Sequence, residues 1–189
     1  RMVTPGDDRI ICSDAYNGAM LWEIMIPKAA RIGTQRDAGW VAMDSRNVYA
    51  AARDYCLKID LDSGQRLAKL SPPSPGMDWG YLAIDDDRLY GSTQKTEASW
   101  LAYHFHQKAD TGSDIHRFND TPITCIRSLF CTNNDIGTTV WSYDTRNSLD
   151  GRDFVIFNPA ICIAKEGDGF YFLESYGQPA VASAEEPGR

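Results

Sequence analysis

The chain has 189 residues, of which 43% are hydrophobic and 24% charged, and its formal net charge is −7. These proportions are typical of a folded globular domain and give no support to a disordered, collagen-like or coiled-coil chain. The negative charge would repel a phosphate backbone, so nucleic acid is not an expected partner, and no apolar run approaches the roughly 18 residues of a membrane-spanning helix.

Short apolar and aromatic runs, many of them alternating with polar residues, predict β-strands along most of the chain. Turn residues interrupt these runs about every ten residues, and no amphipathic crossover helix separates them. This spacing predicts an all-β sandwich, barrel or propeller. The predicted strands cover residues 9–14, 20–26, 39–44, 47–52, 55–60, 66–71, 79–85, 88–93, 100–105, 128–133, 139–144, 153–158, 160–165 and 169–175.

A repeated frame decides among these architectures. In each copy a strand ends in Asp or Asn, the chain turns through Gly, and the next strand follows. Asp or Asn can bond the turn backbone, Gly accepts a positive φ, and a large residue four positions after Gly can pack over the adjacent unit. The three copies place Asp14, Gly18 and Trp22, then Asp60, Gly64 and Ala68, then Asn133, Gly137 and Trp141 in equivalent positions.

A second repeated element places Tyr49, Tyr90 and Tyr171 alike after a polar turn. Both elements indicate a unit of about 40 residues with four strands, which is typical of a propeller blade. We therefore expect an all-β β-propeller of four-stranded antiparallel blades, partial, with three to four blades in residues 1–176. Residues 95–125 are expected to be an insertion, with a degenerate extra blade as the alternative, and residues 177–189 to be a loop or disordered tail.

The repeated frame resembles the docking motif Ala-x-Asp-x-x-Thr-Gly-x-x-x-Trp of the pyrroloquinoline quinone (PQQ) type propeller repeat. It departs from that motif where Asn17, Ser63 and Ile136 replace Thr and where Ala68 replaces Trp. The resemblance implies a bacterial, quinoprotein-like repeat protein in the periplasm or otherwise outside the cytoplasm. It also implies that the frame residues dock one blade on the next: Asp14, Gly18, Trp22, Asp60, Gly64, Asn133, Gly137 and Trp141.

What the resemblance implies about activity is divided, because a repeat specifies fold better than function. Some relatives are dehydrogenases that hold PQQ and calcium in a central channel with a vicinal Cys-Cys disulfide. This chain has no adjacent Cys pair, and the calcium ligands cannot be placed in it. Other relatives are scaffolds without a cofactor. We expect a binding or scaffold module for a protein partner or a small molecule; the alternative is part of a PQQ- and calcium-dependent dehydrogenase.

The eight blades of this family at about 40 residues each need at least about 320 residues, so we also expect a fragment whose missing blades belong to the same propeller. No catalytic or cofactor-binding residue can be assigned from the sequence. PQQ and calcium remain options only for a longer protein.

One cluster resembles a metal site. His104 and His106 would share one face of a strand, and His116 or a nearby carboxylate would complete the ligand set. The competing interpretation is a histidine-containing loop that binds no metal.

The remaining candidates have structural interpretations. Trp22 and Trp141 are expected to pack between blades, whereas Trp79 is the aromatic residue to examine for exposure to a central channel. Cys12 and Cys131 are expected to be small buried residues, with a Cys125–Cys131 disulfide as an option in an oxidising compartment. Acidic pairs and runs are expected to be turn residues rather than calcium ligands: Asp7 and Asp8, Asp85 to Asp87, and Asp168.

Overall fold

The computed structural model describes residues 1–29, 39–96, 115–118, 121–144, 156–157, 163–166 and 169–172, and within these ranges every regular element is a β-strand. For β10, β13, β14, β15, residues 121–126 and Lys95, only the backbone is described. None of the described residues belongs to a helix that is long and apolar enough to cross a membrane. The strands are β1 (Met2–Gly6), β2 (Arg9–Ser13), β3 (Met20–Met25), β4 (Val41–Met43), β5 (Asn47–Ala52), β6 (Tyr55–Asp60), β7 (Arg66–Leu70), β8 (Met77–Asp85), β9 (Arg88–Lys95), β10 (Ile115–Phe118), β11 (Thr121–Asn133), β12 (Thr139–Asp144), β13 (Ile156–Phe157), β14 (Ile163–Glu166) and β15 (Gly169–Phe172).

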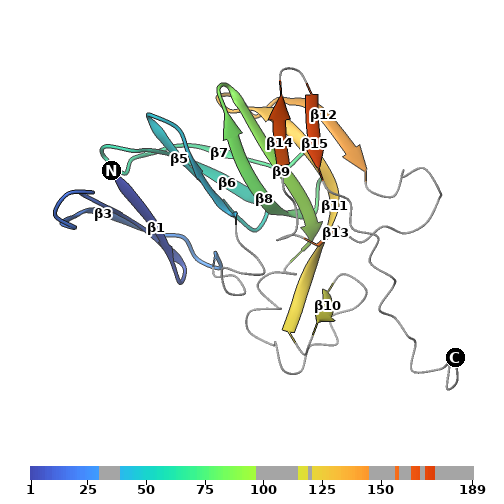
Figure 1. Ribbon diagram of the computed structural model, residues 1–189, viewed down its shortest axis with the longest axis horizontal. Coiled ribbons are helices and arrows are strands. Elements are labelled where there is room, and N and C mark those ends of the chain that lie inside the picture. Colours follow the sequence, from blue (N-terminus) through green and yellow to red (C-terminus); the bar gives the residue numbers. More distant parts are fainter. Residues whose placement is uncertain are drawn as a thin grey trace, which may run out of the picture.

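The strands form successive antiparallel sheets, which confirms the predicted all-β fold of propeller blades. Blade 1 is β1-β2-β3, blade 2 is β4-β5-β6-β7, and blade 3 is β8-β9-β11-β12, with β10 and β13 also pairing with β11. A further hairpin, β14-β15, follows. Figure 1 shows the three blades side by side in chain order, in the way that blades succeed one another in a propeller.

The outer hairpin of each blade has the same irregularity at the same repeat position. The pairing register shifts at Cys12/Ser13 in blade 1, at Lys58/Ile59 in blade 2 and at Cys131/Thr132 in blade 3. Just before each shift, Cys12 lies opposite Trp22, Lys58 opposite Ala68 and Cys131 opposite Trp141. A β-bulge increases the local twist of a strand pair, so the three outer hairpins share one twisted geometry.

The inner hairpins also repeat. Ala42 lies opposite Tyr49, Ala83 opposite Tyr90, and Ala164 opposite Tyr171. The recurring tyrosine of the sequence therefore occupies one backbone position in blade 2, in blade 3 and in the β14-β15 hairpin. Tyr49 is fully buried and Tyr90 nearly so, as expected for a face that another sheet covers.

One hydrophobic core runs through the three blades, from Ile10 and Ile24 in blade 1 to Leu89 and Phe130 in blade 3. Trp79 is fully buried, and its ring meets Phe130 edge-to-face with the ring centroids 4.8 Å apart. A Cβ on Gly91 would lie 2.6 Å from the Phe130 ring and 2.7 Å from the Trp79 ring, so this aromatic pair requires glycine there.

The connection between β9 and β11 contains most of the segment predicted as an insertion. These two strands are neighbours in blade 3, so the chain between them leaves and re-enters the same sheet. Within that segment, the structure describes β10 and the start of β11. Residues 177–189, predicted as a tail, lie outside the described residues.

Candidate functional site

The frame residues form the same type of turn in each blade. In blade 1 the Asp14 carboxylate accepts hydrogen bonds from the backbone N–H groups of Tyr16 (2.8 Å) and Asn17 (3.2 Å), which lower its pKa. In blade 2 the Asp60 carboxylate accepts from Ser63, which likewise lowers its pKa. Each turn ends on a glycine with positive φ: 74° at Gly18, 74° at Gly64 and 70° at Gly137.

The seam between blades 1 and 2 is closed by a tryptophan. Trp22 Nε1 donates a hydrogen bond of 3.0 Å to the backbone oxygen of Leu61, in the turn of blade 2. Its ring covers Gly64, where a Cβ would lie 2.9 Å from ring atoms. At the edge of the seam, Arg1 forms an ion pair of 2.9 Å with Asp62.

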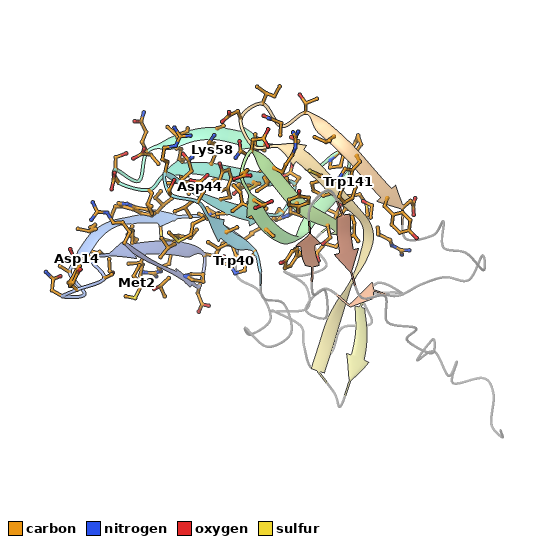
Figure 2. All side chains as sticks on the ribbon, turned by 45° about the horizontal axis from the view of Figure 1, so that its top comes forward. Met2, Asp14, Trp40, Asp44, Lys58 and Trp141 are labelled. Atoms are coloured by element: carbon orange, nitrogen blue, oxygen red, sulfur yellow. The ribbon has the colours of Figure 1, made fainter. Side chains whose placement is uncertain are left out.

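At the seam between blades 2 and 3, an ion pair of Lys58 takes the place of this tryptophan. Figure 2 labels Lys58 on blade 2. Lys58 occupies the position of Cys12, and Ala68 that of Trp22. The Lys58 ammonium donates a hydrogen bond to the carboxylate of Asp135, in the turn of blade 3. This bond and the positive charge of Lys58 lower the pKa of Asp135. Leu70 packs over Gly137 as Trp22 packs over Gly64. A Cβ on Gly137 would lie 3.3 Å from the Cδ2 atom of Leu70.

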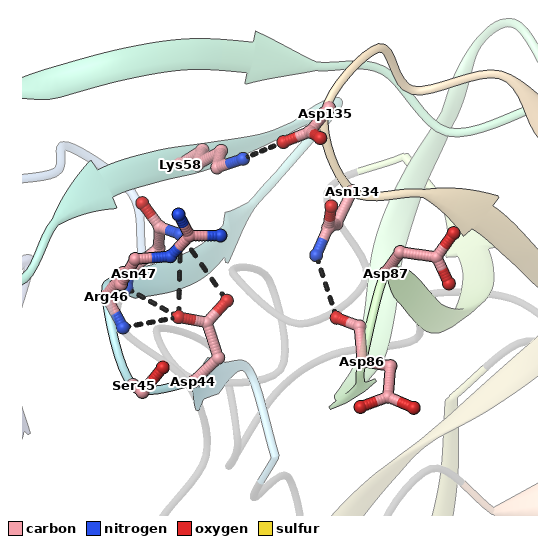
Figure 3. A pocket seen from close by; sticks show the side chains of 9 residues that line it. All are labelled: Asp44, Ser45, Arg46, Asn47, Lys58, Asp86, Asp87, Asn134 and Asp135. Atoms are coloured by element: carbon pink, nitrogen blue, oxygen red, sulfur yellow. Dashed lines mark hydrogen bonds and ion pairs between the residues drawn. The ribbon is translucent and has the colours of Figure 1, made fainter.

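A polar pocket lies between blades 2 and 3 (Figure 3). We call it the interblade pocket, and its volume is about 510 Å³. It lies among the β4-β5, β8-β9 and β11-β12 turns. In blade 3 these turns are at the end of the sheet opposite to the C-terminal end of β9. It is lined by Asp44, Ser45, Arg46, Asn47, Lys58, Asp86, Asp87, Asn134 and Asp135.

Asp44 holds the blade 2 wall of the pocket in place. Its carboxylate accepts 2.7 Å hydrogen bonds from the backbone N–H groups of Arg46 and Asn47, and one of 3.2 Å from the Tyr49 hydroxyl. Burial acts to raise the pKa of Asp44, but these hydrogen bonds outweigh burial and the pKa is lowered. Burial, followed by the negative charge of Asp44, raises the pKa of Tyr49. Asp44 is therefore a structural carboxylate.

Asn134 holds the blade 3 wall. Its backbone N–H donates a hydrogen bond to the backbone oxygen of Asp87 (3.0 Å), and its side-chain Nδ2 donates one to the backbone oxygen of Asp86 (3.0 Å). Asp86 has φ 49°, a left-handed conformation that Asp and Asn tolerate better than most residues. The two contacts join the β8-β9 turn to the β11-β12 turn.

The structure places the other predicted site residues apart from the pocket. His104 and His106 lie outside the described residues, as does the side chain of His116 in β10, so the metal site stays a prediction. Among the described residues no group of three or more His, Cys, Asp or Glu is arranged to hold a metal ion. Trp79 is fully buried, so the idea that it faces an open channel is wrong.

One expectation about the cysteines is confirmed and the other is wrong. Cys12 and Cys131 are buried, as predicted. A Cys125–Cys131 disulfide across a hairpin is wrong, because both residues lie on one strand, β11, and Cys131 is a free thiol. Of the acidic groups, Asp7 and Asp8 lie in the β1-β2 turn and Asp86 and Asp87 in the β8-β9 turn, as expected for turn residues.

The interblade pocket itself was not predicted. The available signal was Lys58, a lysine in a frame position that the other two copies fill with cysteine. Its partner Asp135 lies 77 residues further along the chain, so short-range sequence patterns give no sign of the pair.

No family model matches the chain, and no curated protein does. Similar solved structures include a europium-containing methanol dehydrogenase, at 15% identity and TM-score 0.49 over 84% of this chain and 32% of that one. A quinohemoprotein alcohol dehydrogenase from Comamonas testosteroni is similar at 15% identity and TM-score 0.47, over 89% and 31%. BamB from Moraxella catarrhalis is similar at 13% identity and TM-score 0.33, over 86% and 56%. The chain thus spans about a third of the two dehydrogenases and about half of BamB, and the likeness is one of fold alone.

Proposed function

We propose that the chain is a PQQ-like β-propeller repeat module that works as a rigid binding or scaffold domain outside the cytoplasm, for a protein partner or a small molecule. The observation that carries this proposal is the use of its frame residues. Trp22, which the quinoprotein resemblance would make the first aromatic to consider for a cofactor, covers Gly64 and bonds Leu61 across a blade seam. Its role is to hold blades together.

The described residues do not fit a bound quinone. Trp79 offers no exposed face on which a planar cofactor could stack. The carboxylates and thiols of the described residues do not gather into a cation site, and the sequence has no adjacent cysteine pair. If a longer protein binds PQQ and calcium, residues beyond those described here would have to hold them.

The outward face of blade 1 supports a larger propeller. Met2 is 49% exposed, whereas its repeat equivalents Val48 in blade 2 and Leu89 in blade 3 are fully buried. Each of the three pairs with the residue that follows the register shift: Met2 with Ser13, Val48 with Ile59 and Leu89 with Thr132. Since blades 2 and 3 are covered at this position by the preceding blade, a further blade of the same propeller would cover Met2 in the same way.

A quinone assay on the full-length protein tests the proposal. The protein is incubated with PQQ and calcium, free quinone is removed, and dye-linked alcohol oxidation is measured. We expect no tight quinone complex and no turnover. A stoichiometric complex at micromolar quinone that oxidises alcohols would overturn the proposal and establish the dehydrogenase alternative.

A further inference from the structure

The methionines of this chain are unusually exposed. The chain has five methionines, and the structure describes all of them. Met20 is 65% exposed, Met25 51%, Met2 49% and Met43 42%, whereas Met77 is partly buried. Methionine is among the residues most often found inside proteins, so four exposed ones are uncommon. An oxidant that reaches an exposed thioether converts it to a sulfoxide, which makes each of the four a candidate for modification.

Met20 occupies a repeat position that is exposed even in a covered blade. It lies opposite Ser13, beside the register shift of the blade 1 outer hairpin. The residues at the same place beside the shift are Arg66 in blade 2 and Thr139 in blade 3. Both are exposed, although another blade precedes each of them in the structure. The exposure of Met20 therefore does not depend on whether blade 1 has a neighbour on its outward face.

Met2 occupies the opposite kind of position. Its equivalents Val48 and Leu89 are fully buried, because a preceding blade covers them. A further blade of the same propeller would bury Met2 in the same way and leave Met20 in contact with solvent. The exposed fraction and the repeat therefore both single out Met20.

The described thiols do not compete with Met20 for an oxidant. Cys12, Cys56 and Cys131 are all buried. Burial also raises the pKa of the Cys12 and Cys56 thiols. Since the thiolate is the form that peroxides attack, and access is needed as well, these cysteines are protected.

A sulfoxide at Met20 is compatible with the fold. Oxidation turns a flexible apolar side chain into a polar one, which disrupts a core. Met20 belongs neither to the hydrophobic core nor to the residues packed against it. It lies at the start of β3, which has β2 as its one neighbour among the described strands (Figure 1). The new oxygen would therefore be hydrated.

We propose that Met20 is the first of the described side chains to be modified by a two-electron oxidant of the hydroperoxide class. The Met20 sulfur attacks one oxygen of hydrogen peroxide, and the O–O bond breaks. A proton passes from the oxygen now on sulfur to the departing hydroxide, which leaves as water. The thioether is oxidised to the sulfoxide and the peroxide is reduced to water. The inference requires a folded blade 1 and is independent of the binding role proposed above.

Peptide mapping by mass spectrometry tests the site. The full-length protein is treated with hydrogen peroxide, samples are quenched over time, and oxygen uptake is followed at each methionine. We expect Met20 to be oxidised about tenfold faster than Met77 and faster than the other three methionines. In guanidinium chloride the five rates should become equal, because only the fold separates them. Thermal unfolding of the singly oxidised protein should match that of the untreated protein.

Met20→Leu and Met77→Leu are matched variants, since leucine conserves the volume of methionine. Uptake of the first oxygen by the intact protein should slow in Met20→Leu and be unchanged in Met77→Leu. Any other methionine or a described thiol that reacts as fast as Met20 overturns the inference. So does uptake of the first oxygen by Met20→Leu at the wild-type rate, or an order of reactivity that persists in guanidinium chloride.

Discussion

The Trp22 indole and the Leu61 carbonyl oxygen lie 3.0 Å apart across a blade seam, joined by one hydrogen bond between a side chain and a turn. The same turn places Gly64 directly under the indole ring. The Trp22 side chain therefore bonds a backbone oxygen of blade 2 and also packs over a position of blade 2 that has no side chain.

Trp22→Ala should destabilise the protein by about 3 kcal/mol, because it removes a large aromatic contact and leaves a cavity at the seam. Chemical denaturation monitored by circular dichroism measures the free energy of unfolding. The control is Tyr16→Ala, since the side chain of Tyr16 is fully exposed and its loss should change stability by less than about 0.5 kcal/mol. Equal effects of the two substitutions would contradict the docking role.

Gly64→Ala should destabilise more than Gly18→Ala. Both glycines have φ 74°, so alanine adds about 1 to 2 kcal/mol of backbone strain at either position. Only at Gly64 would the new Cβ also meet the Trp22 ring; nothing lies within 4 Å of it at Gly18. The difference between the two unfolding free energies isolates the seam contact, and it should disappear in a Trp22→Ala background.

The Lys58–Asp135 pair should make stability depend on pH in the acid range. The folded-state pKa of Asp135 is lowered, so its contribution is present above the unfolded pKa of about 3.9 and is lost as the pH falls through the folded pKa. Asp135→Asn should therefore reduce the melting temperature at pH 7, and this reduction should shrink as the pH falls below about 3.9 through the folded-state pKa. In a Lys58→Met background, the pH-7 effect of Asp135→Asn should become smaller. An effect that persists unchanged in that background would show that Asp135 acts through another contact.

Zinc titration tests the proposed histidine site. If His104, His106 and His116 hold a metal ion, the wild-type protein should bind one equivalent of zinc, and His104→Ala and His106→Ala should each lose it. Equilibrium dialysis with metal analysis gives the stoichiometry. Identical zinc binding by wild type and both variants would reject the site.

The blade architecture was predictable because its signals are local. Asp14 and Gly18, or Asp60 and Gly64, lie within five residues of each other and form one turn, and the pattern recurs often enough to give the period. Ala42 and Tyr49 likewise belong to one hairpin. Turn chemistry and strand alternation act over such distances, so the sequence is sufficient to predict them.

The interblade pocket was not predictable because it is created by partners far apart in the chain. Lys58 and Asp135 meet only after two blades have packed face to face. Trp79 shows the same limit. A tryptophan beside glycine at the start of a strand has no local feature that separates a channel-facing ring from a buried one. Its environment is set by Phe130, on a strand that follows a long connection.

The repeated bulge restricts how this chain can tolerate insertions and deletions. In β3, side chains alternate between the face toward blade 2, which carries Trp22, and the opposite face. Loss of one residue between Ser13 and Met20 would move each β3 side chain to the opposite face of the blade, unless the bulge at Cys12/Ser13 were lost at the same time. Each of the three outer hairpins therefore has one place where a single-residue length change can be absorbed without exchanging the two faces of the blade.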